Sequence, residues 1–132
     1  MLGSKMRITG LAAAAALTLG VFTGTASAEG DPEKGEKLYR QCKACHVVDK
    51  EQNRVGPHLV GLFGREAGSV EGFKYSDAMK ESGIVWDEET IGAYLADPKG
   101  YIPGNRMPYA GMKDEQDRAD IIAYMKEATA TE

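Results

Sequence analysis

The chain has 132 residues, with 16 Lys and Arg against 20 Asp and Glu, so its formal net charge is −4. An excess of negative charge argues against nucleic acid as a partner. The chain contains only two cysteines and two histidines, and their placement therefore decides which metal or redox chemistry is available to it.

Residues 1–28 differ in character from the rest of the chain. Lys5 and Arg7 stand before an apolar run at residues 8–22, and Ala26-Ser27-Ala28 is a small-x-small cleavage site. This arrangement predicts a secretory signal peptide that is cleaved, which places the mature protein in the periplasm of a bacterium. The alternative is an uncleaved anchor on the same domain, although the run is shorter than the roughly 20 residues that a membrane span needs.

Residues 29–132 are predicted to form one domain. Without the first 28 residues its net charge is −6. A domain of this size buries only about 60 to 65% of its unfolded surface, so a large buried cofactor would add much to its core. Export would also permit a disulfide.

The first predicted helix has Asp31 as its N-cap and Pro32 at its first position. An apolar stripe follows at helical spacing and consists of Gly35, Leu38, Tyr39 and Cys42. Because glycine within a helix is unfavourable, Gly35 on this stripe predicts that another backbone crosses close by.

Three further helices are predicted, at residues 76–82, 88–96 and 114–128. Gly83 ends the first of them and Pro98 the second. The segments 55–72 and 97–111 are rich in Gly and Pro and are predicted to be loops. No long run alternates between apolar and polar residues, so the predicted fold class is all-α with much irregular chain.

The motif Cys-Lys-Ala-Cys-His at residues 42–46 contains both cysteines and one histidine. Its residues could hold zinc, form a disulfide or attach a haem. Zinc would need Cys42, Cys45, His46 and His58 together, but adjacent side chains at positions 45 and 46 point apart on a helical turn. Dithiol oxidoreductases place such a disulfide between a strand and a helix, and no strand is predicted here.

Covalent haem accounts for the whole motif. Cys42 and Cys45 are three residues apart and can bond two vinyl groups at one porphyrin edge, while His46 can reach the iron. For the sixth iron ligand we favour Met107, which lies between Pro103 and Pro108 in a loop without helical periodicity. The other candidates are Met79, Met112, Met125 and His58, with Met112 the next choice.

Five segments follow one another in the order typical of class I cytochromes c, which the chain resembles over residues 30–130. They read GDPEKGEKLYRQCKACH, VGPHLVGLFGREAG, FKYSDAMKESGIVW, YLADPKGYIPGNRMPYAGM and DRADIIAYMKEAT. The resemblance implies four to five helices with long loops around one haem c. It also implies that His46 and Met107 are the axial iron ligands, and that the C-terminal helix crosses at Gly35.

Further site residues are implied by the same resemblance. The turn before Pro57 would offer a backbone carbonyl to the ring N–H of His46. Tyr75 and Trp86 would donate to a haem propionate, and Arg65 would offset its charge. Tyr94 would lie near the Met107 sulfur and tune the iron through its hydroxyl, and Asn105 stands where a threonine is usual. Met79 and Tyr109 also depart from the family pattern, at an asparagine and a phenylalanine position.

An iron with two protein ligands has no vacancy for substrate, so the predicted role is one-electron transfer rather than catalysis. The expected protein is a soluble, monomeric, periplasmic carrier that serves a cytochrome bc-type complex, a terminal oxidase or a photosynthetic reaction centre. Four cations are predicted to surround the haem edge, namely Lys43, Lys99, Arg106 and Lys113. Two alternatives remain at this stage: a haem enzyme or sensor with an open sixth site, and a dithiol or metal module without haem.

Overall fold

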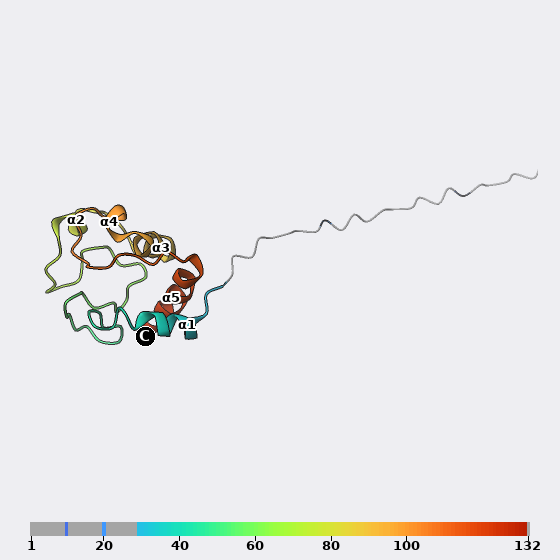
Figure 1. Cartoon of the computed structure of the whole chain (residues 1–132), viewed down its shortest axis with the longest axis horizontal. Helices are drawn as coiled ribbons and strands as arrows, with labels where there is room; N and C mark the ends of the chain where they lie inside the picture. Colours follow the sequence, from blue (N-terminus) through green and yellow to red (C-terminus); the bar gives the residue numbers. More distant parts are fainter. Residues whose placement is uncertain (1–9, 11–19, 21–28, 132) are drawn as a thin grey trace, which may run out of the picture.

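The computed structural model describes residues 29–131 together with Gly10 and Gly20, so the signal peptide predicted at residues 1–28 lies outside the described residues. Five helices follow in chain order: α1 (Pro32–Tyr39), α2 (Asp77–Lys80), α3 (Glu88–Ala96), α4 (Pro98–Tyr101) and α5 (Glu115–Ala128) (Figure 1). Within the described residues the β structure amounts to one isolated bridge between Glu66 and Val85. The predicted all-α class is confirmed.

Helix α1 begins as predicted but ends earlier. The Asp31 carboxylate accepts from the backbone N–H groups of Glu33 and Lys34 over 3.0 and 3.3 Å. The helix then ends at Tyr39 rather than continuing to Cys42. The Cys42 N–H donates to the Tyr39 carbonyl three residues back, over 2.8 Å, so tight turns replace the helix. The cysteines therefore lie on a separate turn beyond the helix.

Helices α1 and α5 pack directly against each other, and Figure 1 shows them side by side. At Gly35 the approach is so close that a Cβ atom would lie 2.6 Å from the Asp120 carbonyl carbon. The crossing predicted from that glycine is confirmed, and α5 is the crossing helix. The buried Asp120 carboxylate also accepts from the Asp31 N–H over 2.7 Å, which ties the start of α1 to α5.

Helix α4 lies in a segment that was predicted to be a loop. Pro98 was interpreted as the end of α3, but it also occupies the first position of α4. Asp97 serves both helices: it is the C-cap of α3, and its side chain accepts from the Gly100 N–H over 3.1 Å. This single turn carries the chain from α3 into the segment that contains Met107.

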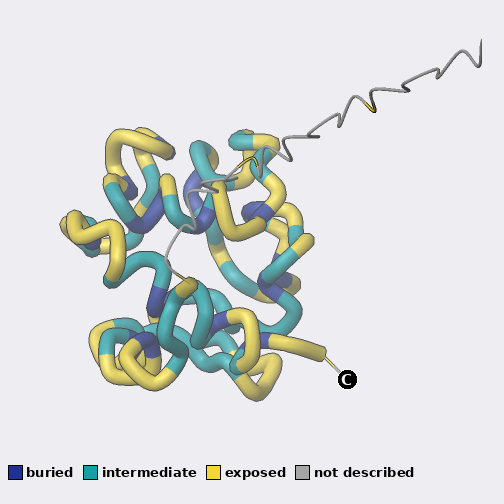
Figure 2. The backbone as a smooth tube through the Cα atoms, turned by 90° about the vertical axis from the view of Figure 1, so that its right-hand side faces the viewer, coloured by how far each residue is buried: buried dark blue, intermediate teal, exposed yellow. Residues whose placement is uncertain are grey.

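The remaining predicted helices agree with the structure to within two residues. Ser76 caps α2, and its hydroxyl accepts from the Met79 N–H over 3.1 Å. Asp87 and Thr90 form a capping box at the start of α3. Figure 2 shows exposed residues along the outer loops and buried residues mostly closer to the centre of the domain. Among residues 29–131 no helix is long and apolar enough to cross a membrane.

A cavity that joins two thiols, an imidazole and a thioether

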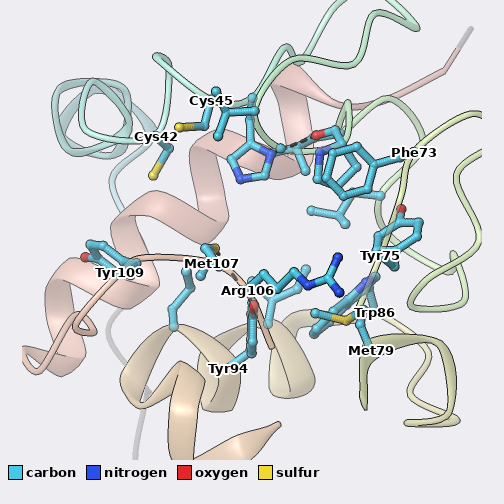
Figure 3. A pocket seen from close by; sticks show the side chains of 18 of the residues that line it. Cys42, Cys45, Phe73, Tyr75, Met79, Trp86, Tyr94, Arg106, Met107 and Tyr109 are labelled. Atoms are coloured by element: carbon cyan, nitrogen blue, oxygen red, sulfur yellow. Dashed lines mark hydrogen bonds between the residues drawn. The ribbon is translucent and has the colours of Figure 1, made fainter. Parts of the chain in front are cut away.

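A cavity of about 320 Å³ lies between α1, α3, α5 and the long loops. Nine of the ten predicted site residues line it: Cys42, Cys45, His46, Pro57, Arg65, Tyr75, Trp86, Tyr94 and Met107. The tenth, Asn105, lies outside the wall. Figure 3 shows the two thiols at one end of the cavity and Tyr75, Trp86 and Met79 at the other.

Both cysteines are free and partly buried in the structure. Burial, followed by the nearby Cys45, raises the pKa of Cys42 to about 11. A thiol that keeps its proton in neutral solution is a poor nucleophile for disulfide exchange. Among the described residues no three His, Cys, Asp or Glu side chains are grouped so as to hold a metal ion. The zinc and disulfide alternatives therefore gain no support from the geometry.

The ring of His46, which lines the cavity, is held through one of its two nitrogens. Its Nδ1 lies 2.7 Å from the carbonyl oxygen of Pro57, and since that oxygen can only accept, Nδ1 carries the proton. Burial lowers the pKa of the ring, which favours the neutral imidazole. Nε2 then has a free lone pair, as an iron ligand requires. The predicted carbonyl belongs to Pro57 itself rather than to the turn before it.

The ring of His46 also needs a neighbour without a side chain. A Cβ atom at Gly56 would lie 2.7 Å from Nδ1 of His46. The Gly56 N–H donates to the Cys45 carbonyl over 3.0 Å, which brings this loop against the motif. The loop at 56–57 therefore cradles the histidine through its backbone alone.

Met107 is held in the cavity wall by two residues behind it. The Asn105 side-chain oxygen accepts from the Met107 N–H over 2.9 Å and from the Tyr94 hydroxyl over 3.3 Å. The same Tyr94 hydroxyl lies 3.9 Å from the Met107 sulfur, within range of a weak donation. The Asn105 amide donates to the Pro98 and Ile102 carbonyls over 2.7 and 2.9 Å. Asn105 thus anchors the Met107 loop to α4.

The other candidate ligands are placed less favourably. Met112 is 6% exposed in the hydrophobic core and does not line the cavity. Met79 and Met125 do line it. Met125 belongs to the buried face of α5, and Met79 lies beside Trp86, at the end far from the thiols (Figure 3). His58 lies outside the cavity wall, and its Nδ1 accepts from the Val60 N–H over 3.2 Å.

The end of the cavity away from the thiols is suited to an anion. The Arg65 Nη1 donates to the His58 and Val60 carbonyls over 3.0 and 3.1 Å, but its buried Nε has no partner. A buried, unpaired guanidinium N–H is costly and indicates a missing acceptor. The Tyr75 hydroxyl accepts from the Val70 N–H, which leaves its own proton to donate. The site therefore fits a haem, with thiols for its vinyl edge and donors for its carboxylates.

Sequence reasoning missed several residues of the cavity. Its apolar wall is built from side chains of two helices and of the long loops, namely Leu59, Leu62, Phe73, Ile91, Leu95 and Ile121. In the sequence, these residues were marked only by their apolar character and spacing, which does not distinguish a cavity wall from ordinary core. Of the four cations predicted around the haem edge, Arg106 lines the cavity, whereas Lys43, Lys99 and Lys113 do not. The exposed Lys74, which was not predicted, also lines it.

Paired thiols, a neutral imidazole and an unpaired guanidinium around one apolar cavity define a protein that holds haem covalently. A family model described as cytochrome c matches residues 32–129. Cytochrome c of Theileria annulata is 52% identical over 104 residues, which cover 77% of this chain and 90% of the relative. Cytochrome c2 of Blastochloris viridis is 49% identical over 119 residues, covering 86% of this chain and 94% of the relative.

The chain belongs to the cytochrome c family. This membership confirms the class I cytochrome c that was expected from the five segments, and with it one haem c attached through Cys42 and Cys45. The protein is accordingly an electron carrier and not an enzyme. Cytochrome c2 iso-2 of Magnetospirillum fulvum is 54% identical over 88 residues, which cover 67% of this chain and 92% of that relative.

Proposed function

We propose that the protein is exported, cleaved after residue 28 and used in the periplasm as a monomeric carrier of single electrons, with His46 and Met107 as the axial iron ligands. The observation that supports this most directly is that both of these residues are held in place by hydrogen bonds. The His46 ring is fixed by the Pro57 carbonyl, and the Met107 backbone is fixed by the Asn105 side chain. Haem c, when bound, supplies an Fe(III)/Fe(II) couple.

The protein's own residues would set the behaviour of that couple. Met107 contributes a soft thioether, which favours ferrous iron. The buried side chains of Ile91, Leu95 and Ile121 line the cavity and would keep water from a bound haem, and a dry site disfavours the additional charge of ferric iron. Both effects favour a clearly positive reduction potential. Because His46 and Met107 are each held by hydrogen bonds, little reorganisation accompanies the gain or loss of an electron.

The carboxylates of the cofactor would be held at the Arg65 end of the cavity. The unpaired Nε of Arg65 and the hydroxyl proton of Tyr75 supply donors there, and the Trp86 side chain lines the same end. A carboxylate in an apolar cavity is stable only with such partners. The hydrogen bonds thereby fix the orientation of the cofactor between the two axial side chains.

The redox partners proposed are membrane complexes: a cytochrome bc-type complex as donor, and a terminal oxidase or a photosynthetic reaction centre as acceptor. Two exposed cations, Lys74 and Arg106, line the cavity and so lie where an electron would enter or leave. Positive charge at that place favours an acidic docking surface. The proposal includes no nucleic acid, which the negative net charge disfavours.

The axial ligand is tested by replacing Met107 with leucine, which keeps the apolar volume but removes the sulfur. We expect the oxidised Met107→Leu protein to lose the far-red absorption band of iron–sulfur ligation and to bind added imidazole readily. Two matched controls, Met79→Leu and Met112→Leu, remove a different sulfur and are expected to keep the band. A band that persists in Met107→Leu and disappears in either control would refute the assignment.

A further inference from the structure

Tyr39, the last residue of α1, makes a contact that its place on an apolar helix stripe did not predict. Its hydroxyl donates to the backbone carbonyl of His46 over 2.9 Å. The side chain is only 4% exposed and lines the haem cavity, and it also lines a second pocket between α1 and residues 46–49. A phenylalanine would satisfy the packing equally well, so the hydroxyl calls for a separate explanation.

The bond from Tyr39 completes a set of restraints on one residue. The His46 amide donates to the Cys42 carbonyl over 3.0 Å, and its ring Nδ1–H donates to the Pro57 carbonyl. The carbonyl of His46 lies where the chain leaves the turn at residues 40–45. Among the described residues, the Tyr39 side chain donates to this carbonyl. The amide, ring and carbonyl of the histidine are thus all held.

Packing keeps the phenol in place. The rings of Tyr39 and Tyr124 have centroids 5.3 Å apart and are tilted by 46°. Tyr124 belongs to α5, so the hydroxyl of Tyr39 is positioned by the same α1–α5 contact that Gly35 permits.

We propose that Tyr39 is a positioning residue for the iron-ligating histidine, which it controls through the hydrogen bond to the His46 carbonyl. The inference rests on the proposed ligation of iron by His46. The bond has two consequences. It fixes the backbone from which the imidazole projects, and its donor offsets the negative end of a carbonyl dipole on the residue that would hold the iron. Without the hydroxyl, that dipole would favour ferric over ferrous iron.

The test is the Tyr39→Phe variant of the haem-loaded protein, in which the ring and its packing are kept. At a fixed solution potential near the midpoint, the ferric-to-ferrous ratio is expected to rise about threefold, equivalent to about 28 mV for a one-electron couple. The low-spin ferric electron paramagnetic resonance spectrum should shift or broaden as well, because it reports the orientation of the axial ligands. Site-specific 3-fluorotyrosine at position 39, a stronger donor, should move the ratio in the opposite direction.

Tyr124→Phe is the matched control, since it removes a hydroxyl from the other ring of the pair. It is expected to leave the potential and the resonance spectrum unchanged. The inference is overturned if Tyr39→Phe changes only the thermal stability, or if Tyr124→Phe moves both readouts equally. The far-red band of the unaltered protein reports the proposed axial pair separately, so failure here leaves that proposal intact.

Discussion

Individual side chains act here mainly by holding other residues of the site in position. Asn105 does not line the cavity, yet its oxygen accepts from both the Met107 amide and the Tyr94 hydroxyl. Its amide donates to two carbonyls of α4 and the turn after it. One short side chain therefore sets the position of the proposed sulfur ligand and of the phenol beside it. The threonine that is usual here in class I cytochromes c has one polar side-chain atom, a hydroxyl oxygen. Asparagine has two, an amide oxygen and an amide nitrogen.

The Tyr94 hydroxyl is expected to raise the reduction potential, because a donor within reach of the Met107 sulfur draws electron density from it and so favours ferrous iron further. In Tyr94→Phe the potential should fall, by at most the roughly 1 kcal/mol of a neutral hydrogen bond, which is about 40 mV for one electron. Burial raises the pKa of Tyr94 to about 12, so the phenol keeps its proton in neutral and mildly alkaline solution. The difference between the two proteins should therefore be constant from about pH 6 to about pH 9.

Redox titration at several pH values measures this difference. Tyr101→Phe is the control: Tyr101 lies 6.5 Å from Tyr94 between ring centroids and is exposed, so the same change there should have no effect on the potential. A Tyr94→Phe protein with a higher potential than the parent would contradict the direction argued here. A difference that varies across that pH range would contradict the protonation state.

At this scale, prediction from sequence succeeded where chemistry demanded one residue type at one spacing. The spacing of Cys42 and Cys45 predicted an attached haem, which membership of the family confirms. The ligand roles of His46, beside them, and of Met107, an apolar residue in an aperiodic loop, stay predictions. The hydroxyl of Tyr39 and the cation at Lys74 were missed, because nothing local distinguishes a tyrosine that donates to a carbonyl from one that only packs. Such roles depend on which distant segment lies opposite, and a single sequence does not contain that information.

Among the helices, α1 and α5 form the frame on which the haem motif is mounted. The motif follows α1 directly, so any change in the angle between these helices moves Cys42 and Tyr39 relative to the cavity. Their close approach depends on Gly35, where a Cβ atom would lie 2.7 Å from the Tyr124 Cβ. The obstacle is backbone and Cβ, which cannot turn aside as a long side chain would.

Gly35→Ala is therefore expected to destabilise the protein, even though alanine favours a helix. Overpacking in a core lowers the free energy of unfolding by about 1 to 3 kcal/mol. Because the neighbours of Gly35 are rigid, we expect the loss here to lie at the upper end of that range. Gly92→Ala in α3 is the control, because its Cβ would meet only the Ile122 side chain at 3.6 Å, an ordinary contact. That variant should gain up to about 1 kcal/mol from helix propensity.

Denaturant unfolding of the two haem-loaded variants gives these free energies. Equal stability of Gly35→Ala and Gly92→Ala would show that the helix crossing has more freedom than the structure allows. The helices themselves were predictable to different degrees. Caps and charges marked α3 and α5 clearly, whereas α4 was missed because Asp97 and Pro98 give the signals of a helix end and a helix start at the same place.

For the whole molecule, two opposite electrostatic influences act on an approaching redox partner. Residues 29–132 carry a net charge of −6, yet two exposed cations, Lys74 and Arg106, line the cavity. The distance over which charges act is about 10 Å at 0.1 M salt and about 30 Å at 0.01 M. Near physiological ionic strength the cations at the cavity should therefore dominate, and at low salt the negative body should contribute as well.

This balance is measurable as the rate at which small oxidants accept an electron from the reduced protein. Lys74→Gln and Arg106→Gln should each slow the reaction with anionic hexacyanoferrate(III) and speed it with cationic tris(phenanthroline)cobalt(III). The expected change is about threefold at about 0.1 M salt, from one unit of charge near a trivalent probe about 10 Å away. Lys34→Gln on α1 changes the net charge equally, but Lys34 does not line the cavity.

The control variant should match the parent at about 0.1 M salt and depart from it only at about 0.01 M, where the whole charge of the molecule acts on the oxidant. The two cavity variants should differ from the parent at both concentrations. If all three variants behave alike at 0.1 M, net charge alone governs the encounter. Lys74 and Arg106 would then have no steering role, and the acidic docking surface proposed for the partner would lose its support.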